Sequence, residues 1–200
     1  MKKIILYLLT LTYFSIFSAA AECNFTINIG EKINKKFIEK FTEPMEMYNG
    51  QFMLPVPSPE VCPNDNLGMD IAVEYLFLGD LKNMKLATIR MLALNDDKNT
   101  TSNKLTLMNY AKKIYGNFDT GFNPKAYNNF EIWEEGQSIV LYKRFTNADQ
   151  IIEEEIYISN KEFDQKLGDF FNQIEMNQLK KDFNKNEFKI IIFEIIICIV

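Results

Sequence analysis

Carboxylate side chains are the only abundant groups in this 200-residue sequence that could transfer protons in a reaction. Three glutamates lie between residues 131 and 135, and residues 153–155 are three glutamates in a row. Hydrolysis of a glycan would use two carboxyl groups about 5–10 Å apart in a cleft, one of them with a pKa raised by burial. Lys143 and Arg144 lie on the strand predicted between the two groups, so we expect cross-strand ion pairs on a solvated face instead.

The sequence contains no histidine, the side chain most often used as a general base. Triads of serine, histidine and aspartate, pairs of cysteine and histidine, and histidine-ligated zinc are therefore excluded. The Asn- and Asp-rich segments at residues 64–66 and 95–99 lack the spacing of a calcium-binding loop. We expect no catalytic residue, no cofactor and no metal, and keep a carboxylate-dependent glycan hydrolase as the alternative.

Trp133 is the only tryptophan, and we expect it on a strand, on the face opposite Phe130 and Ile132. Together with Tyr127 and Tyr157, it is predicted to form an aromatic patch on an uncovered face of a sheet. Such a patch could bind a sugar or a partner peptide. A second small core beneath a proline-rich segment is the alternative.

The three cysteines are Cys23, Cys62 and Cys198. For an exported chain we predict a disulfide between Cys23 and Cys62, because thiols are oxidised outside the cytosol. The bond would close a loop of about 40 residues and stabilise the fold by about 3–4 kcal/mol. Two unpaired buried thiols are the alternative. A closed zinc site would need four ligands, more than these distant thiols provide.

Residues 1–21 have the organisation of a secretory signal peptide. Lys2 and Lys3 precede an apolar stretch at residues 4–17, and three alanines at residues 19–21 provide the small residues before a cleavage site at Glu22. The apolar stretch is short for a membrane-spanning helix, which needs about 20 residues. We therefore expect an exported protein, either periplasmic or secreted.

The spacing of apolar residues predicts a single α+β domain at residues 22–176. Helices are expected at residues 31–42 and 104–115, with a third one opened by a capping box that Ser159 and Glu162 form. Strands are expected as a hairpin and a three-stranded meander, at residues 70–78, 85–94, 127–134, 138–145 and 151–158. For the second strand a helix is the alternative, because Leu81, Met84, Ile89 and Leu92 also have helical spacing. The five prolines within residues 44–68 indicate an extended segment that crosses the surface. The predicted architecture is an antiparallel sheet of about five strands covered on one face by helices.

Residues 177–200 are predicted to form a polar and then apolar tail. The apolar part, residues 190–200, is about half as long as a bilayer span and contains Glu194. Membrane contact by residues 188–200, in a tethered accessory protein, is a further alternative. The formal net charge of −5 does not suit a nucleic-acid partner. We expect a non-catalytic protein that binds a protein or an envelope glycan through an exposed sheet face.

Overall fold

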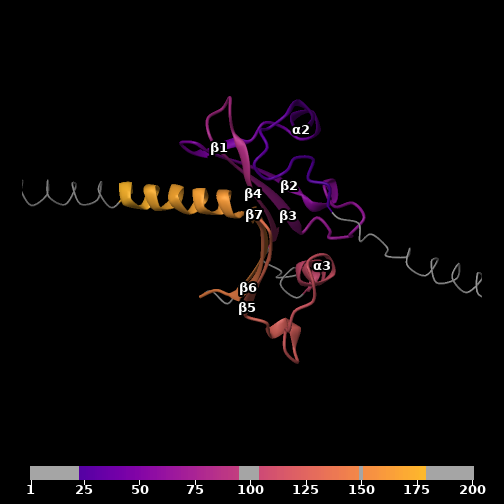
Figure 1. Ribbon diagram of the computed structural model, residues 1–200. Helices are drawn as coiled ribbons and strands as arrows, with labels where there is room; N and C mark the ends of the chain where they lie inside the picture. Colours follow the sequence, from indigo (N-terminus) through magenta and orange to yellow (C-terminus); the bar gives the residue numbers. More distant parts are fainter. Residues whose placement is uncertain (1–22, 95–103, 149–150, 179–200) are drawn as a thin grey trace, which may run out of the picture.

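The computed structural model describes residues 23–94, 104–148 and 151–178 (Figure 1). The predicted signal peptide, residues 1–21, lies outside the described residues and stays a prediction. Of the predicted tail, only residues 177 and 178 are described, and both belong to the helix that begins at residue 161.

The described residues form one antiparallel sheet of seven strands, in the order β1-β2-β3-β4-β7-β6-β5. Four strands are neighbours both in the chain and in the sheet: β1 (Met45–Tyr48), β2 (Gln51–Pro57), β3 (Ile71–Leu78) and β4 (Lys85–Ala93). Three more form a meander: β5 (Asn129–Glu135), β6 (Ser138–Thr146) and β7 (Ile152–Asn160). Pairing of β4 with β7 joins the two groups. The predicted antiparallel α+β architecture is confirmed, but the sheet has more strands than the five expected.

The two additional strands, β1 and β2, lie in the proline-rich segment that was expected to be irregular. Alternate residues of β2 are buried, with Phe52, Leu54 and Val56 turned into the core. β1 pairs with β2 only as far as Met53, so prolines 55 and 57 lie beyond the end of β1. No strand among the described residues pairs with the outer edge of β2 there, so a missing amide hydrogen removes no hydrogen bond from the sheet. Two prolines are therefore compatible with a strand at this position.

Helices α2 (Lys35–Lys40) and α3 (Thr106–Ile114) lie on the same side of the sheet (Figure 1). From α2, Phe37 packs against Tyr75 and Phe77, with ring centroids 5.1 and 5.7 Å apart. We call this side of the sheet the covered face. α2 begins later than predicted because Asn34 caps it, its Oδ1 accepting a hydrogen bond from the amide of Phe37 at 2.9 Å.

The helix at residues 161–178 projects from the opposite side of the sheet, which we call the open face (Figure 1). The prediction that all helices cover one face is therefore wrong. Phe163 and Leu167, near the start of this helix, are buried against Ala87 of β4. The predicted capping box is also wrong, because Ser159 still belongs to β7 and donates to the carbonyl of Ala87. Asn160 caps the helix instead, with its Oδ1 2.9 Å from the amide nitrogen of Phe163.

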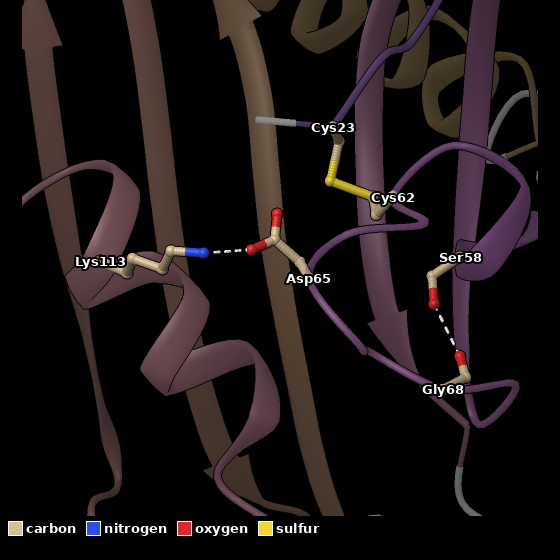
Figure 2. Close-up of a disulfide and its surroundings, with 6 residues drawn as sticks. All are labelled: Cys23, Ser58, Cys62, Asp65, Gly68 and Lys113. Carbon is tan, nitrogen blue, oxygen red and sulfur yellow. Dashed lines mark hydrogen bonds and ion pairs between the residues drawn. A yellow bond between two sulfur atoms is a disulfide. The ribbon is translucent and has the colours of Figure 1, made fainter. Parts of the chain in front are cut away.

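A disulfide joins Cys23 to Cys62, with 4.3 Å between the two Cα atoms, as predicted (Figure 2). Cys62 follows the short 3-10 helix η1 (Ser58–Glu60), in the loop that leads to β3. The same loop is closed by Ser58, whose hydroxyl donates to the carbonyl of Gly68 at 2.6 Å (Figure 2). Asp65 forms an ion pair with Lys113 of α3. The disulfide therefore ties the first described residue to a loop that is itself fixed to the covered face.

Candidate binding groove on the open face

A groove of about 760 Å³ lies on the open face, between the first turns of the helix at residues 161–178 and strands β1 to β4, β7 and β6. Its volume is within the range of about 300–1,000 Å³ that is typical of ligand sites. Most of its walls are apolar. The apolar and aromatic residues that line it are Met47, Tyr48, Met53, Leu76, Leu141, Tyr157, Leu167 and Phe171.

The residues that form the floor of the groove are set by the alternation of side chains along each strand and by the register of the sheet. Arg90 on β4 lies opposite Tyr157 on β7, and Tyr157 lies opposite Leu141 on β6. On the other side, Leu76 of β3 lies opposite Met53 of β2. Because alternate residues of a strand share a face, these five side chains lie on one surface. The apolar part of that surface is not covered by α2 or α3.

A row of four alternating charges crosses the middle of this surface, from β3 to β6. Arg90 donates from Nη1 to Glu74 at 2.9 Å, and from Nε and Nη2 to the two carboxylate oxygens of Glu155 at 2.6 and 3.2 Å. Lys143 Nζ lies 2.7 Å from Glu155 Oε2. Each of the four charged groups thus has a partner of opposite sign, and the row carries no net charge.

Glu155 is held ionised by its partners. Burial pushes the pKa of Glu155 up, but the hydrogen bonds and positive charges of Arg90 and Lys143 outweigh it and leave the pKa below its usual value. The Glu155 side chain is only 6% exposed. At neutral pH this carboxyl group is therefore a structural anion and is poorly suited to donate a proton.

We expect Glu155→Gln to destabilise the fold by about 1–2 kcal/mol at pH 7, since Arg90 and Lys143 are partly exposed and therefore screened. The folded pKa is below the unfolded one, so the stabilisation by Glu155 is present above the usual glutamate pKa of 4.5 and is lost as the pH falls through the folded pKa. Urea unfolding of both proteins at pH 7 and pH 3 measures this, and the difference should shrink at pH 3. A difference that stays constant or grows at pH 3 would contradict the assignment.

The helix at residues 161–178 forms one wall of the groove. Asp164, on its first turn, accepts a hydrogen bond from the hydroxyl of Tyr157 at 2.8 Å. Leu167 is buried, whereas Phe171, one turn further on, is 45% exposed. The helix is thus anchored at its start and extends an apolar side chain over the groove.

The structure does not bring the three predicted binding residues together. Tyr157 lies on the open face, in the groove. Trp133 lies opposite Val140, whose side chain is in the core of the covered face, while Ile132 lies opposite Leu141 on the open face. The prediction that Trp133 is on the face opposite Phe130 and Ile132 is thus confirmed. A shared patch with Tyr157 is not formed.

Trp133 and Tyr127 are part of an aromatic cluster on the covered face. Phe118 is at its centre, with ring centroids 5.6 Å from both Trp133 and Tyr127 and 5.3 Å from Tyr142. Tyr115 adds a further contact with Trp133 at 5.7 Å. These rings pack against the main core. The cluster fixes the loop between α3 and β5 onto the sheet, whereas a role in ligand binding stays a prediction.

The expected solvated face of glutamates is wrong for two of the three consecutive acids. Glu154 and Arg144 form an ion pair on the covered face, 2.8 Å apart, with both side chains 1% exposed. The other oxygen of Glu154 accepts from the Tyr142 hydroxyl at 2.8 Å and from the amide of Met108 at 3.1 Å. The cross-strand pairing of Lys143 with Glu155 and of Arg144 with Glu154 is nevertheless as predicted.

Glu154 also takes the place of a side-chain cap for α3. The N-cap residue of α3, Leu105, makes no capping hydrogen bond through its side chain, and Met108 is the third residue of the helix. The carboxylate of Glu154 therefore satisfies an amide that the helix leaves without a partner, and its charge suits a helix N-terminus. Burial raises the pKa of Glu154, while Arg144 and the hydrogen bonds act in the opposite direction.

The predicted binding residues do not include Met47, Met53 and Phe171, although all three line the groove. The two methionines lie in the proline-rich segment that was expected to be irregular. The alternation of Phe52, Leu54 and Val56 was the available signal for a strand there, and it would have placed Met53 on the opposite face.

Within the described ranges, no helix is long and apolar enough to cross a bilayer. The same residues contain no group of three or more acidic or cysteine side chains that could hold a metal ion. Comparison with protein-family models, with curated proteins and with solved structures found no match.

Proposed function

We propose that the protein is an exported, non-catalytic binding protein whose open-face groove takes an apolar segment of a partner protein. The observation that carries the proposal is an apolar groove on a sheet face that α2 and α3 leave open. Its basic residues pair with Glu155, and Asp164 accepts a hydrogen bond from Tyr157. The Cys23–Cys62 disulfide supports the exported location, because such bonds persist in oxidising compartments.

The chemistry of the lining favours a protein segment as the ligand. Met47 and Met53 are flexible and polarisable, and methionine is common on surfaces that bind varied apolar side chains. Tyr48 and Phe171 are about half exposed and add aromatic contact area of the kind that anchors protein interfaces. The charged residues that line the groove are two basic and two acidic ones, so the groove has no excess charge to attract a strongly ionic ligand.

The same geometry weakens the case for a carboxylate-dependent glycan hydrolase. That reaction needs a carboxyl group of raised pKa in the same cleft as a second carboxylate. The groove holds Glu155, whose pKa is lowered, whereas Glu154, whose pKa is raised, lies beneath α3 on the covered face. The two acids are adjacent in sequence and therefore point to opposite faces of the sheet.

The proposal is tested by selecting linear peptides from a random library displayed on phage, with the disulfide-bonded protein as bait. We expect the selected peptides to be rich in apolar residues. Their affinity should fall at least tenfold, or about 1.4 kcal/mol, in the variants Met53→Asp and Phe171→Asp, which put a charge into the groove. Fluorescence anisotropy of labelled peptides measures the affinity.

Phe122→Asp is the matched control, because Phe122 is fully exposed on the loop between α3 and β5. It introduces the same charge and should leave the affinity unchanged. Circular dichroism confirms that each variant is folded. Peptides that bind Met53→Asp and Phe171→Asp as tightly as the unmodified protein would overturn the proposal, as would a selection that enriches no apolar peptide.

A further inference from the structure

We propose a second interaction surface at the outer edge of β5, which accepts an extended segment of a partner protein as an additional strand. In that segment, basic residues alternate with apolar ones. β5 is the last strand of the sheet, so among the described residues no strand pairs with its outer edge. This surface differs from the groove and does not depend on the groove being a binding site.

The backbone of β5 is arranged for such pairing. β5 and β6 are joined by a two-residue turn, and Glu135 lies opposite Ser138 across it. In a hairpin of this kind the residues flanking the turn form a hydrogen-bonded pair, and such pairs then recur at every second residue. The backbone groups of Phe130, Ile132 and Glu134 therefore point away from β6. In agreement with this, the amide of Phe130 donates to the side chain of Asn129, at 2.9 Å.

On the open face, an added strand would lie beside apolar side chains. Phe130 and Ile132 are 50% and 44% exposed, unusually high values for large apolar residues on neighbouring positions of one face. Ile132 lies opposite Leu141, so this apolar strip continues the floor of the groove towards the sheet edge. A partner side chain on this face should therefore be apolar.

On the covered face, the same strand would lie beside acidic side chains. Glu131 and Glu135 both lie on this face, at alternate positions that flank Trp133. Across the described part of the chain, neither of these two glutamates has a cation within ion-pair distance, whereas Glu134 pairs with Lys161 at 2.9 Å. A partner side chain beside either of them should carry a positive charge.

The acidic edge also discriminates against a second copy of the chain. Two β5 strands paired across a two-fold axis would bring glutamates from both copies together, and like charges on paired strands are destabilising. A strand that alternates lysine or arginine with apolar residues satisfies both faces at once. The edge thus repels itself and selects a partner of opposite charge.

The test uses a synthetic peptide in which lysine and valine alternate, and a second one in which glutamate and valine alternate. We expect the lysine peptide to bind the unmodified protein and to bind the double variant Glu131→Lys/Glu135→Lys at least tenfold more weakly. The glutamate peptide should show the reverse preference. Isothermal titration measures the affinities, and hydrogen exchange should show slower exchange of the Ile132 and Glu134 amides when the lysine peptide is bound.

The double variant Glu39→Lys/Glu60→Lys is the control, because it changes the net charge by the same amount at exposed positions away from β5. It should retain nearly all of the affinity for the lysine peptide. Met53→Asp, which tests the groove, should also leave this affinity unchanged, so the two proposals can fail separately. Equal loss in both charge-reversal variants would overturn the edge proposal, as would Ile132 and Glu134 amides that are already protected without peptide.

Discussion

Replacing both Cys23 and Cys62 by alanine is expected to lower the free energy of unfolding by about 4 kcal/mol. The two cysteines are 39 residues apart in sequence, so the bond restricts a long loop of the unfolded chain. It also fixes the first described residue to the loop that Asp65 attaches to α3. Equilibrium unfolding in urea, with and without a reductant, measures the loss.

Cys198→Ala is the matched control, because it removes the remaining cysteine and leaves the Cys23–Cys62 bond in place. Its unfolding midpoint should equal that of the unmodified protein, and reductant should lower both midpoints. The double alanine variant should not respond to reductant. A loss below about 1 kcal/mol in the double variant would show that the disulfide is not an important source of stability.

Glu154→Gln is expected to destabilise the fold by about 3 kcal/mol or more, because it removes one partner of a buried ion pair. Arg144 would lose the carboxylate that accepts from its Nη1, in a site where both side chains are 1% exposed. The amide side chain also cannot reproduce a charged acceptor for both Tyr142 and the amide of Met108. Chemical denaturation at pH 7 measures the change.

Glu153→Gln is the control for this substitution, since Glu153 is the exposed neighbour on the same strand and its change should cost less than about 0.5 kcal/mol. A double-mutant cycle with Arg144→Met isolates the pair. We expect the double variant to be clearly more stable than the sum of the two single losses predicts. Additive losses would show that Glu154 and Arg144 stabilise the fold independently.

The strands with regular alternation were predictable from the sequence, and those with interruptions were not. β3, β5, β6 and β7 show apolar residues at alternate positions, which locates them, whereas β4 has an irregular pairing with β3 and also fits a helical spacing. β2 contains two prolines. The sheet can accommodate them because the pairing of β1 with β2 ends before it reaches either proline. The point at which β1 ends is set by the pairing of β1 with β2, so the sequence of β2 alone does not reveal it.

The candidate site was harder to predict than the strands. Alternation fixes which residues of one strand share a face, and it placed Trp133 correctly relative to Ile132. Whether Trp133 shares a face with Tyr157 depends on the registers of β5 with β6 and of β6 with β7. A shift by one residue moves a side chain to the other face, so distant strands cannot be related without the structure.

The environments of the glutamates could not be read from their residue types. Glu153, Glu154 and Glu155 are identical in sequence terms, yet one is exposed, one is buried under α3 and one is paired in the groove. Acidic residues are seldom buried, so an exposed face was the reasonable expectation. Glu154 and Glu155 differ from this expectation because Arg144 and Arg90 supply partner charges that are buried or partly buried.

Binding of a partner at the open face of the sheet can be followed by NMR of the protein with ¹³C-labelled methionine methyl groups and a ¹⁵N-labelled indole. Met47 and Met53 report on the groove, whereas Trp133 reports on the covered face. On titration with a peptide selected from the library, we expect both methionine signals to shift and the indole signal to stay unchanged. A shift of the Trp133 indole, with both methionine signals unmoved, would show that the peptide binds elsewhere than in the open-face groove.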